Sequence, residues 1–241
     1  TQEQAHVLRE LSCYAREHNR PIYYAFIDCK AAFDRVNRAM LLVKLFEAID
    51  QSDWMLLNEE YDTTTAAVGD EIMTMVTGIR EGGLSSPTCF NLHINDLVTL
   101  LKQSKIGFKV GLLLICVLLF ADDIVLIASC ITDLQKLLDI LWKFAAKNHM
   151  SFGIKKCAIS YFDPSRNPND KPIAMLGTKK LEIVSHYKYL GIEEAMSDDY
   201  SVFLKRKKQE VTVKLLDAQR VGGRHGGLLP PDARRLYFTL I

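Results

Sequence analysis

The sequence predicts an α+β domain in which a small antiparallel sheet packs on helices. Residues 22–27 (IYYAFI) and 112–128 (LLLICVLLFADDIVLIA) are rich in the aliphatic and aromatic side chains that are typical of buried strands. The second run is interrupted by Ala121-Asp122-Asp123, which predicts a turn between two paired strands. Residues 134–145 repeat apolar side chains at helical spacing, which predicts a helix that covers the sheet.

The elements before the first strand and directly after it are predicted from apolar spacing and from residues that break helices. Residues 4–18 have helical spacing, and Asn19-Arg20-Pro21 is expected to end that helix before the strand 22–27. Asp28 is therefore expected at the end of a strand. Residues 37–49 are predicted to form a buried helix that is followed by a polar segment.

The next predicted elements are a hairpin over residues 64–77, with its turn at Gly69-Asp70, and a helix over residues 88–103. Ser86 is expected to cap this helix, because its hydroxyl can accept from free backbone N–H groups. Pro87 follows at a position that favours proline at the start of a helix.

After the strand pair, Thr132 and Gln135 are predicted to form a capping box for the next helix. Its apolar face is interpreted as core rather than as a ligand site: Leu134, Leu137, Leu138, Leu141, Trp142 and Ala145. Short strands are expected around 157–162 and 186–192, and basic helices from residue 200 onward.

Composition narrows the class of protein. The net charge is +1, but residues 205–235 contain nine Lys or Arg and three Asp or Glu, which predicts a local basic face. The six cysteines have no CxxC spacing, so no zinc site or disulfide framework is indicated, and an intracellular location in the nucleus or cytoplasm is expected. No apolar run reaches the length of about 20 residues that spans a membrane. The final ARRLYFTLI suggests a piece of a longer protein.

Two predicted strands end in acids, at Asp28 and at Asp122-Asp123. Carboxylates held by a rigid sheet suit hard cations such as Mg²⁺, and two such ions about 3.5–4 Å apart can clamp the oxygens of a phosphoryl transfer. The alternative is a turn with ordinary solvated acids, which is the interpretation of Asp198-Asp199 among polar neighbours. The apolar strands around Asp122-Asp123 favour the metal site.

Several motifs resemble those of the reverse transcriptases of non-LTR (LINE-type) retrotransposons. IDCKAAFDRV resembles the block D-x-x-K-A-F-D, GIREGGLSSPTCFNLHINDL resembles G-V-R-Q-G-C-P-L-S-P followed by a helix, and FADDIVLIA resembles the F/Y-A-D-D block. GIKKCAISYF and HYKYLGI resemble the later lysine-containing block and the primer-grip strand. Together they cover about residues 22–192, and the three main blocks occur in the family's order.

The resemblance implies a polymerase right-hand palm with fragments of fingers and thumb. The expected organisation is the end of the fingers or a connecting helix over 1–20 and a palm over 21–197. A fingers-proximal insertion is expected within the palm at about 37–77, and the start of a truncated thumb over 198–241.

The resemblance also implies roles for individual residues. Asp28, Asp122 and Asp123 match the catalytic metal-binding carboxylates, with Asp28 and Asp122 as direct ligands of two Mg²⁺ ions, for which Mn²⁺ can substitute. Phe33 matches the steric gate, where a bulky ring would clash with a ribose 2′-OH. Lys156 matches the lysine that protonates the pyrophosphate leaving group; its alternative is a surface lysine in a loop.

Departures from the family pattern lie in the second block, which contributes to nucleotide binding. Glu81 stands where the family usually has Gln, which places a negative charge near the incoming nucleotide. Gly82 matches the family's glycine, but Gly83-Leu84 replaces the usual Cys-Pro, which loosens a loop that normally constrains this site.

A basic run is expected to bind nucleic acid, because its position corresponds to the start of the thumb, where phosphate contacts would hold the primer and template. A solvated helix face is the alternative. The run consists of Lys205, Arg206, Lys207 and Lys208.

Two functional hypotheses follow. The first is an RNA-directed DNA polymerase that adds dNTPs to a primer 3′-OH, with an RNA template, a DNA primer and the other domains of a retrotransposon polyprotein as partners and no membrane. This segment alone is expected to be inactive. The second, motivated by Glu81, is a catalytically decayed or domesticated scaffold that only binds nucleic acid or protein.

Overall fold

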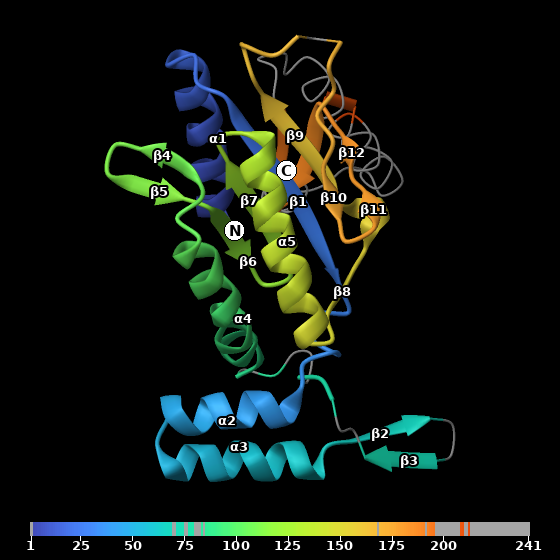
Figure 1. The fold of residues 1–241 in the computed structure, drawn as a ribbon. Coiled ribbons are helices and arrows are strands. Elements are labelled where there is room, and N and C mark those ends of the chain that lie inside the picture. Colours follow the sequence, from blue (N-terminus) through green and yellow to red (C-terminus); the bar gives the residue numbers. More distant parts are fainter. Residues whose placement is uncertain are drawn as a thin grey trace, which may run out of the picture. The chain divides into compact units, whose positions relative to one another are not determined.

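The computed structural model describes residues 2–68, 71–74, 77–79, 83, 85–167, 169–190, 192–195, 208, 209 and 212 (Figure 1). The chain forms two compact units, Thr1–Met196 and Ser197–Ile241. Only residues 208, 209 and 212 of the second unit are described, so the fold below is that of the first. The domain boundaries expected from the sequence stay predictions.

A central sheet organises the first unit. Its strands run in the order β12-β9-β1-β7-β6, and β8 pairs with the end of β1. All of these pairs are antiparallel except β12 with β9, which confirms the predicted α+β class with a small, mainly antiparallel sheet. The strands are β1 Ile22–Lys30, β6 Val117–Phe120, β7 Asp123–Ala128, β8 Ser151–Phe152, β9 Ala158–Phe162 and β12 Glu182–Ile183.

Strand β1 is buried on both faces, because helices cover both sides of the sheet (Figure 1). Tyr23, Ala25 and Ile27 belong to the core beneath the helices α4 and α5. Tyr24 and Phe26 alternate with them and belong to a second core beneath α1. The three helices are α1 Gln2–Glu17, α4 Ser86–Gln103 and α5 Ile131–Lys147.

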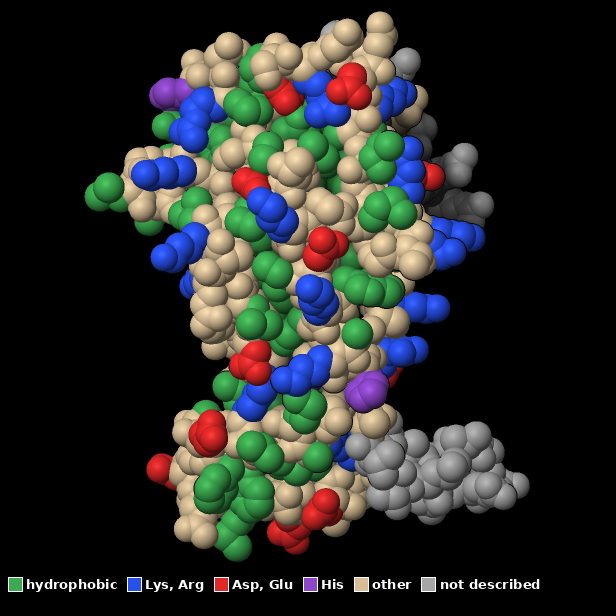
Figure 2. All heavy atoms as spheres, in the orientation of Figure 1, with side chains coloured by type: hydrophobic (Ala, Val, Ile, Leu, Met, Phe, Trp, Pro, Cys, Tyr) green, Lys and Arg blue, Asp and Glu red, His purple; other side chains and the backbone are tan. Residues whose placement is uncertain are grey.

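The helix predicted over residues 37–49 is α2, Arg38–Ala48, but it is only partly buried. Leu41 and Leu45 are buried, whereas Val43 is 64% exposed and Phe46 is 60% exposed. The expectation of a fully buried helix was wrong, because α2 packs one face and leaves the other to solvent. Figure 2 shows hydrophobic side chains gathered on this surface over α2 and its neighbour α3.

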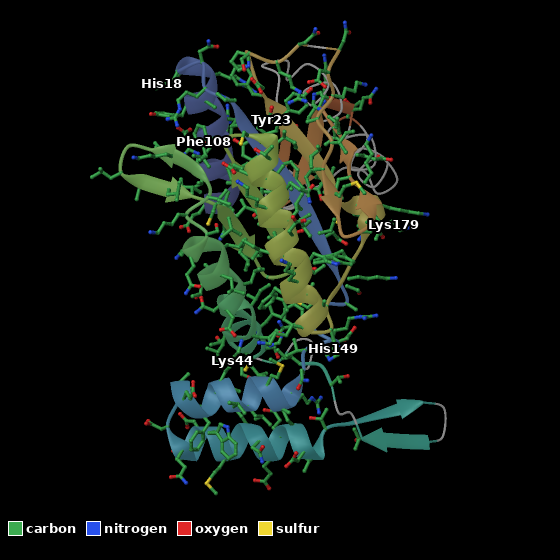
Figure 3. All side chains as sticks on the ribbon, in the orientation of Figure 1. His18, Tyr23, Lys44, Phe108, His149 and Lys179 are labelled. Carbon is green, nitrogen blue, oxygen red and sulfur yellow. The ribbon has the colours of Figure 1, made fainter. Side chains whose placement is uncertain are left out.

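The segment after α2, expected to be merely polar, is the helix α3, Gln51–Thr63. It shares the exposed surface of α2, since Met55 and Leu56 are exposed. Lys44 connects α2 to α4, where its Nζ donates to the carbonyl of His93 at 2.8 Å and lies 2.8 Å from Asp96 Oδ2 (Figure 3).

The expected hairpin over 64–77 is formed by β2, Thr65–Val68, and β3, Glu71–Thr74, and its predicted turn residues Gly69 and Asp70 lie outside the described residues. By contrast, the run 112–120 was wrongly predicted to be one strand. It divides at Cys116 into β5, Leu113–Ile115, and β6.

The reason for this division is a change of partner. Strand β5 pairs with β4, Phe108–Val110, in a separate hairpin, whereas β6 pairs with β7. Leu112, at the tip of the β4–β5 hairpin, is 99% exposed. The start of the apolar run is therefore exposed, whereas Val117, Leu118 and Leu119 of β6 pack partly buried against the core.

Both predicted helix caps were wrong in detail. Helix α4 includes Ser86 in its first turn, and Ser85 occupies the N-cap position without a side-chain cap bond. Helix α5 begins after Cys130, again without such a bond. Gln135 instead holds β10, because its amide exchanges hydrogen bonds with the backbone of Met175 at 2.8 and 2.9 Å.

The predicted apolar face of α5 is core apart from Trp142, which is exposed. The strand expected at 186–192 is β13, and it pairs with β14 in a hairpin. Within the described residues, no helix combines the length and the apolar character needed to cross a bilayer. The remaining elements are η1 Ile154–Lys156, β10 Met175–Leu176, β11 Lys179–Lys180, β13 His186–Tyr189 and β14 Ile192–Ala195.

Candidate active site

The pairing of β1 with β7 places Asp28 directly opposite Asp123. Asp122 lies beside them in the turn between β6 and β7, and its carbonyl accepts a hydrogen bond of 3.4 Å from the N–H of Cys29. The turn is closed by Ala121, which has a positive φ of 50°. The backbone therefore brings together the three aspartates that the sequence predicted as a site.

The prediction that Asp28 lies at the end of its strand was wrong. Strand β1 continues to Lys30, because Cys29 and Lys30 pair with β8. In a strand, alternate residues share a face, so Asp28 shares the face of Phe26, and Asp123 shares the face of Val125. Both carboxylates are thus directed to the side of the sheet that carries α1 and β13.

The electrostatics of the cluster reflect three like charges. Burial raises the pKa of the Asp123 carboxyl, and the charges of Asp122 and Asp28 raise it further, whereas Lys156 opposes the shift. Like charges placed directly opposite each other destabilise a strand pair. A cation near these carboxylates would therefore offset an unfavourable interaction that the fold itself creates.

The backbone around Asp28 is held from the side of β8 and η1. The N–H of Gly153 donates to the carbonyl of Asp28 at 2.9 Å, and the Nζ of Lys156 lies 3.4 Å from Asp28 Oδ1. The N–H of Asp28 contacts Cys157 Sγ at 3.4 Å. Lys156, predicted at the nucleotide site, is therefore beside the carboxylates.

Two buried thiols line this region, and neither is suited to act as a nucleophile. Burial raises the pKa of Cys29 to about 12, and Asp122 is the next cause of the shift. Burial also raises the pKa of Cys157. Because the thiolate is the reactive form, burial and the raised pKa values disfavour attack by either thiol.

Two tyrosines of β13 also face the acids, and neither was among the predicted site residues. The hydroxyl of Tyr187 donates to the carbonyl of Lys156 at 2.8 Å, and burial raises its pKa to about 12. Tyr189 is buried, and its hydroxyl has no hydrogen-bond partner among the described residues. Burial and Asp123 raise the pKa of Tyr189. The only sequence signal was their place in HYKYLGI.

Phe33 lies in the turn that follows β1 and is half-buried. Its ring stacks on Phe90 of α4 with ring centroids 4.7 Å apart, and its carbonyl accepts from the N–H of Ile79 at 2.8 Å. These contacts fix the position of the ring, and its role as a steric gate stays a prediction.

Several predicted site residues lie outside the described residues: Glu81, Gly82, Lys205, Arg206 and Lys207. Lys208 is described as an exposed helical residue of the second unit, and its carbonyl accepts from the hydroxyl of Thr212 at 2.7 Å. The role of this run in nucleic-acid binding stays a prediction.

The donor atoms of the site can be compared with those that a metal ion prefers. In the part of the chain that the structure describes, no three His, Cys, Asp or Glu side chains are already arranged to hold an ion. The neighbouring groups are nevertheless carboxylate oxygens on a rigid strand pair, which are the donors that Mg²⁺ prefers. The chemistry of the residues fits a hard divalent cation.

The mainly antiparallel sheet, the helices that flank it and the turn with paired acids together form a fold of the polymerase palm class. The chain belongs to the reverse transcriptase (RNA-dependent DNA polymerase) family, whose pattern matches residues 2–193.

Its relatives are proteins of retrotransposable elements. The chain is 26% identical over 193 residues to the retrovirus-related Pol polyprotein from type-1 retrotransposable element R2 of Nasonia vitripennis, which covers 74% of this chain and 19% of the relative. It is 30% identical over 150 residues to the R2DM polyprotein of Drosophila melanogaster (60% and 14%). It is 24% identical over 203 residues to the RNA-directed DNA polymerase from mobile element jockey of the same species (80% and 22%).

These relatives confirm the predicted resemblance to non-LTR reverse transcriptases, although the chain spans less than a quarter of the length of each. Among solved structures, telomerase from Candida albicans in complex with a fragment of telomeric RNA matches with a TM-score of 0.60. That match covers 82% of this chain and 33% of the telomerase chain at 12% identity, so it shows the fold alone.

Proposed function

We propose that this chain forms the polymerase centre of an RNA-directed DNA polymerase within a retrotransposon protein. The observation that carries the proposal is the pairing of Asp28 with Asp123, with Asp122 in the adjoining turn, in a chain of the reverse transcriptase family. An RNA template, a DNA primer and dNTPs are the proposed partners, and the polymerase names of the relatives support them.

In the proposed reaction, the oxygen of the primer 3′-OH attacks the α-phosphorus of a dNTP. The new P–O bond forms as the bond between the α-phosphorus and the α,β-bridging oxygen breaks. Pyrophosphate leaves with that electron pair, and the proton of the 3′-OH passes to solvent water. Two Mg²⁺ ions, or Mn²⁺ in their place, would supply positive charge at the attacking and leaving oxygens when bound.

The residues of the chain have distinct proposed roles in this reaction. Asp28 and Asp122 would hold the cations, and Asp123 would support them from the opposite strand. Lys156, beside Asp28, would donate a proton to the leaving pyrophosphate. The ring of Phe33, fixed against Phe90, would exclude a 2′-OH and so favour deoxynucleotides.

Primer extension by the full-length parent protein on a homopolymer RNA template tests the proposal. Asp122→Asn should abolish extension, because loss of a ligand charge removes several kcal/mol of transition-state stabilisation, or about 10²- to 10⁴-fold in rate. Asp198→Asn is the control, since it removes one acid of the chain's other Asp-Asp pair, which lies outside the described residues. Extension by Asp122→Asn at the parent's rate would refute the assignment.

A non-catalytic scaffold is the alternative, and the charge at Glu81 is the observation that favours it. Glu81→Gln in the same assay distinguishes the two. A parent that is inactive both with Glu81 and with Gln at this position, and that binds no Mn²⁺ through Asp28, would be a scaffold. Extension by either form supports the polymerase.

A further inference from the structure

Gly153 lies against the carboxylate of Asp28. A Cβ added at this glycine would overlap Asp28 Oδ2. The backbone of Gly153 has φ −80° and ψ 70°, so its conformation does not demand a glycine. The carboxylate of Asp28 therefore occupies the space that a side chain at this position would take.

The turn that begins at Gly153 contacts Asp28 at three points. The N–H of Gly153 donates to the Asp28 carbonyl at 2.9 Å, Oδ2 occupies the place that a Cβ at Gly153 would take, and the Nζ of Lys156 lies 3.4 Å from Oδ1. The turn is closed by hydrogen bonds from Lys156 N–H to the Gly153 carbonyl (2.7 Å) and from Cys157 N–H to the Ile154 carbonyl (3.1 Å). We call residues 153–156 the Asp28 turn.

Within this turn, the backbone of Gly153 affects the orientation of the Asp28 carboxylate more than the Lys156 side chain does. The Lys156 side chain is 74% exposed, and exposed ion pairs contribute little to stability and weaken with salt. The Gly153 contacts are steric and backbone contacts that salt does not screen. The glycine leaves open the space that Oδ2 occupies, so the orientation of the Asp28 carboxylate depends on the absence of a side chain at position 153.

Tyr187 supports the Asp28 turn from β13. Its hydroxyl donates to the carbonyl of Lys156 at 2.8 Å. Its ring stacks on Phe26 with centroids 4.1 Å apart and an interplanar angle of 11°. Because Phe26 is a buried residue of β1 two positions before Asp28, the hydroxyl is presented by a fixed ring rather than by a mobile side chain.

We propose that Gly153 and Tyr187 are positioning residues for Asp28: Gly153 sets the orientation of the carboxylate, and Tyr187 holds the turn that carries Gly153 and Lys156. The inference rests on the proposed function in one respect, namely that Asp28 is a cation ligand. Gly153 and Tyr187 would thus position the cation ligand Asp28 without themselves contacting the substrate.

The first test uses the full-length protein with Gly153→Ala, and Lys155→Ala as the control, since Lys155 is an exposed residue of the same turn. In Gly153→Ala, the added Cβ meets the end of a movable side chain, so the unfolding temperature should change little. The Mn²⁺ affinity should fall about 10- to 100-fold, as it does when groups that orient a ligand are altered. Mn²⁺ affinity equal to the parent's would overturn the role of Gly153.

A measurement made without metal distinguishes this inference from the proposed function. Carbodiimide labelling of Asp28, measured by mass spectrometry, should rise in Gly153→Ala, because the carboxylate leaves a position in which the side chain is only 22% exposed. Unchanged labelling contradicts the inference. A parent that binds no Mn²⁺ through Asp28 but shows this increase would refute the metal role and leave the positioning role standing.

The second test is Tyr187→Phe, with Tyr161→Phe as the matched control, because Tyr161 lies on β9 and stacks on Tyr23. Removal of the Tyr187 hydroxyl should accelerate amide hydrogen exchange at Lys156 and Cys157 and lower the Mn²⁺ affinity, with the unfolding temperature near the parent's. Unchanged exchange at these amides would show that Tyr187 does not hold the turn.

Discussion

The hydroxyl of Tyr23 donates a hydrogen bond of 2.5 Å to Asp163 Oδ2, which ties β1 to the loop after β9. Ser165 donates to the other oxygen of Asp163 through its N–H at 3.1 Å and its hydroxyl at 2.7 Å. Burial alone would raise the pKa of Asp163, but these hydrogen bonds outweigh it and leave the pKa below its usual value. Burial and Asp163 raise the pKa of Tyr23 to about 12, so the hydroxyl remains a donor at neutral pH.

This pair gives a prediction for acid stability. A carboxyl whose pKa is lower in the folded state contributes stability above its unfolded pKa of about 3.9, and that contribution is lost as pH falls through the folded value. Tyr23→Phe should therefore lower the unfolding temperature at pH 7 and reduce its decline below about pH 4. Unfolding curves from pH 7 to pH 3 measure this, with Tyr161→Phe as the control. An unchanged acid decline in Tyr23→Phe would contradict the assignment.

At the residue scale, the acids of the site could be predicted from the sequence, but the residues that position them could not. Asp122 and Asp123 were predicted because charges interrupt an apolar strand pair. The contacts that place Gly153 and Tyr187 could not be predicted, since Gly153 meets Asp28 and Tyr187 stacks on Phe26, each more than 100 positions earlier in the chain. A glycine with ordinary backbone angles carries no local signal of such a contact.

At the scale of elements, Phe33 connects the turn after β1 to α4 through its stack on Phe90. Phe33→Val should admit ribonucleotides, because the smaller side chain removes the clash with a 2′-OH. A steric contact of this size discriminates by about 10- to 200-fold. The same change should lower the free energy of unfolding by about 1–3 kcal/mol through lost packing and ring stacking.

Incorporation of rNTPs relative to dNTPs by the full-length protein measures this prediction. Phe46→Val on α2 is the control, since Phe46 is largely exposed. If Phe33→Val discriminated against rNTPs as strongly as the parent, Phe33 would not be the gate.

The elements that were predicted well have strong local patterns, whereas the patterns of those that were missed are obscured or ambiguous. Strand β7 and helix α5 have continuous apolar patterns, and both were found. Helix α3 was missed although Trp54, Leu57 and Tyr61 follow helical spacing and pack toward the core. The exposed Met55 and Leu56 beside them and the polar residues of the segment obscure this pattern. The break at Cys116 was missed because β5 and β6 are equally apolar and differ only in the strands with which they pair.

At the scale of the whole molecule, the site depends on one sheet that joins distant segments. Strand β1 lies between β7 and β9. Strand β7 places Asp123 opposite Asp28, and the segment just before β9 forms the Asp28 turn that contacts Asp28 from the other side. The sequence predicted the acids, but the register that sets Asp28 opposite Asp123 depends on tertiary pairing. The motif resemblance supplied what local patterns could not: that these acids belong to one site.

The central claim is that Asp28 and Asp122 hold divalent cations for polymerisation. Crystals of the full-length protein grown with Mn²⁺, primer–template and a dNTP, examined by anomalous diffraction, test it most directly. We expect anomalous peaks in contact with the carboxylates of Asp28 and Asp122, and their loss in Asp28→Asn. Bound nucleotide with no peak at these carboxylates, or with a peak that persists unchanged in Asp28→Asn, would contradict the claim.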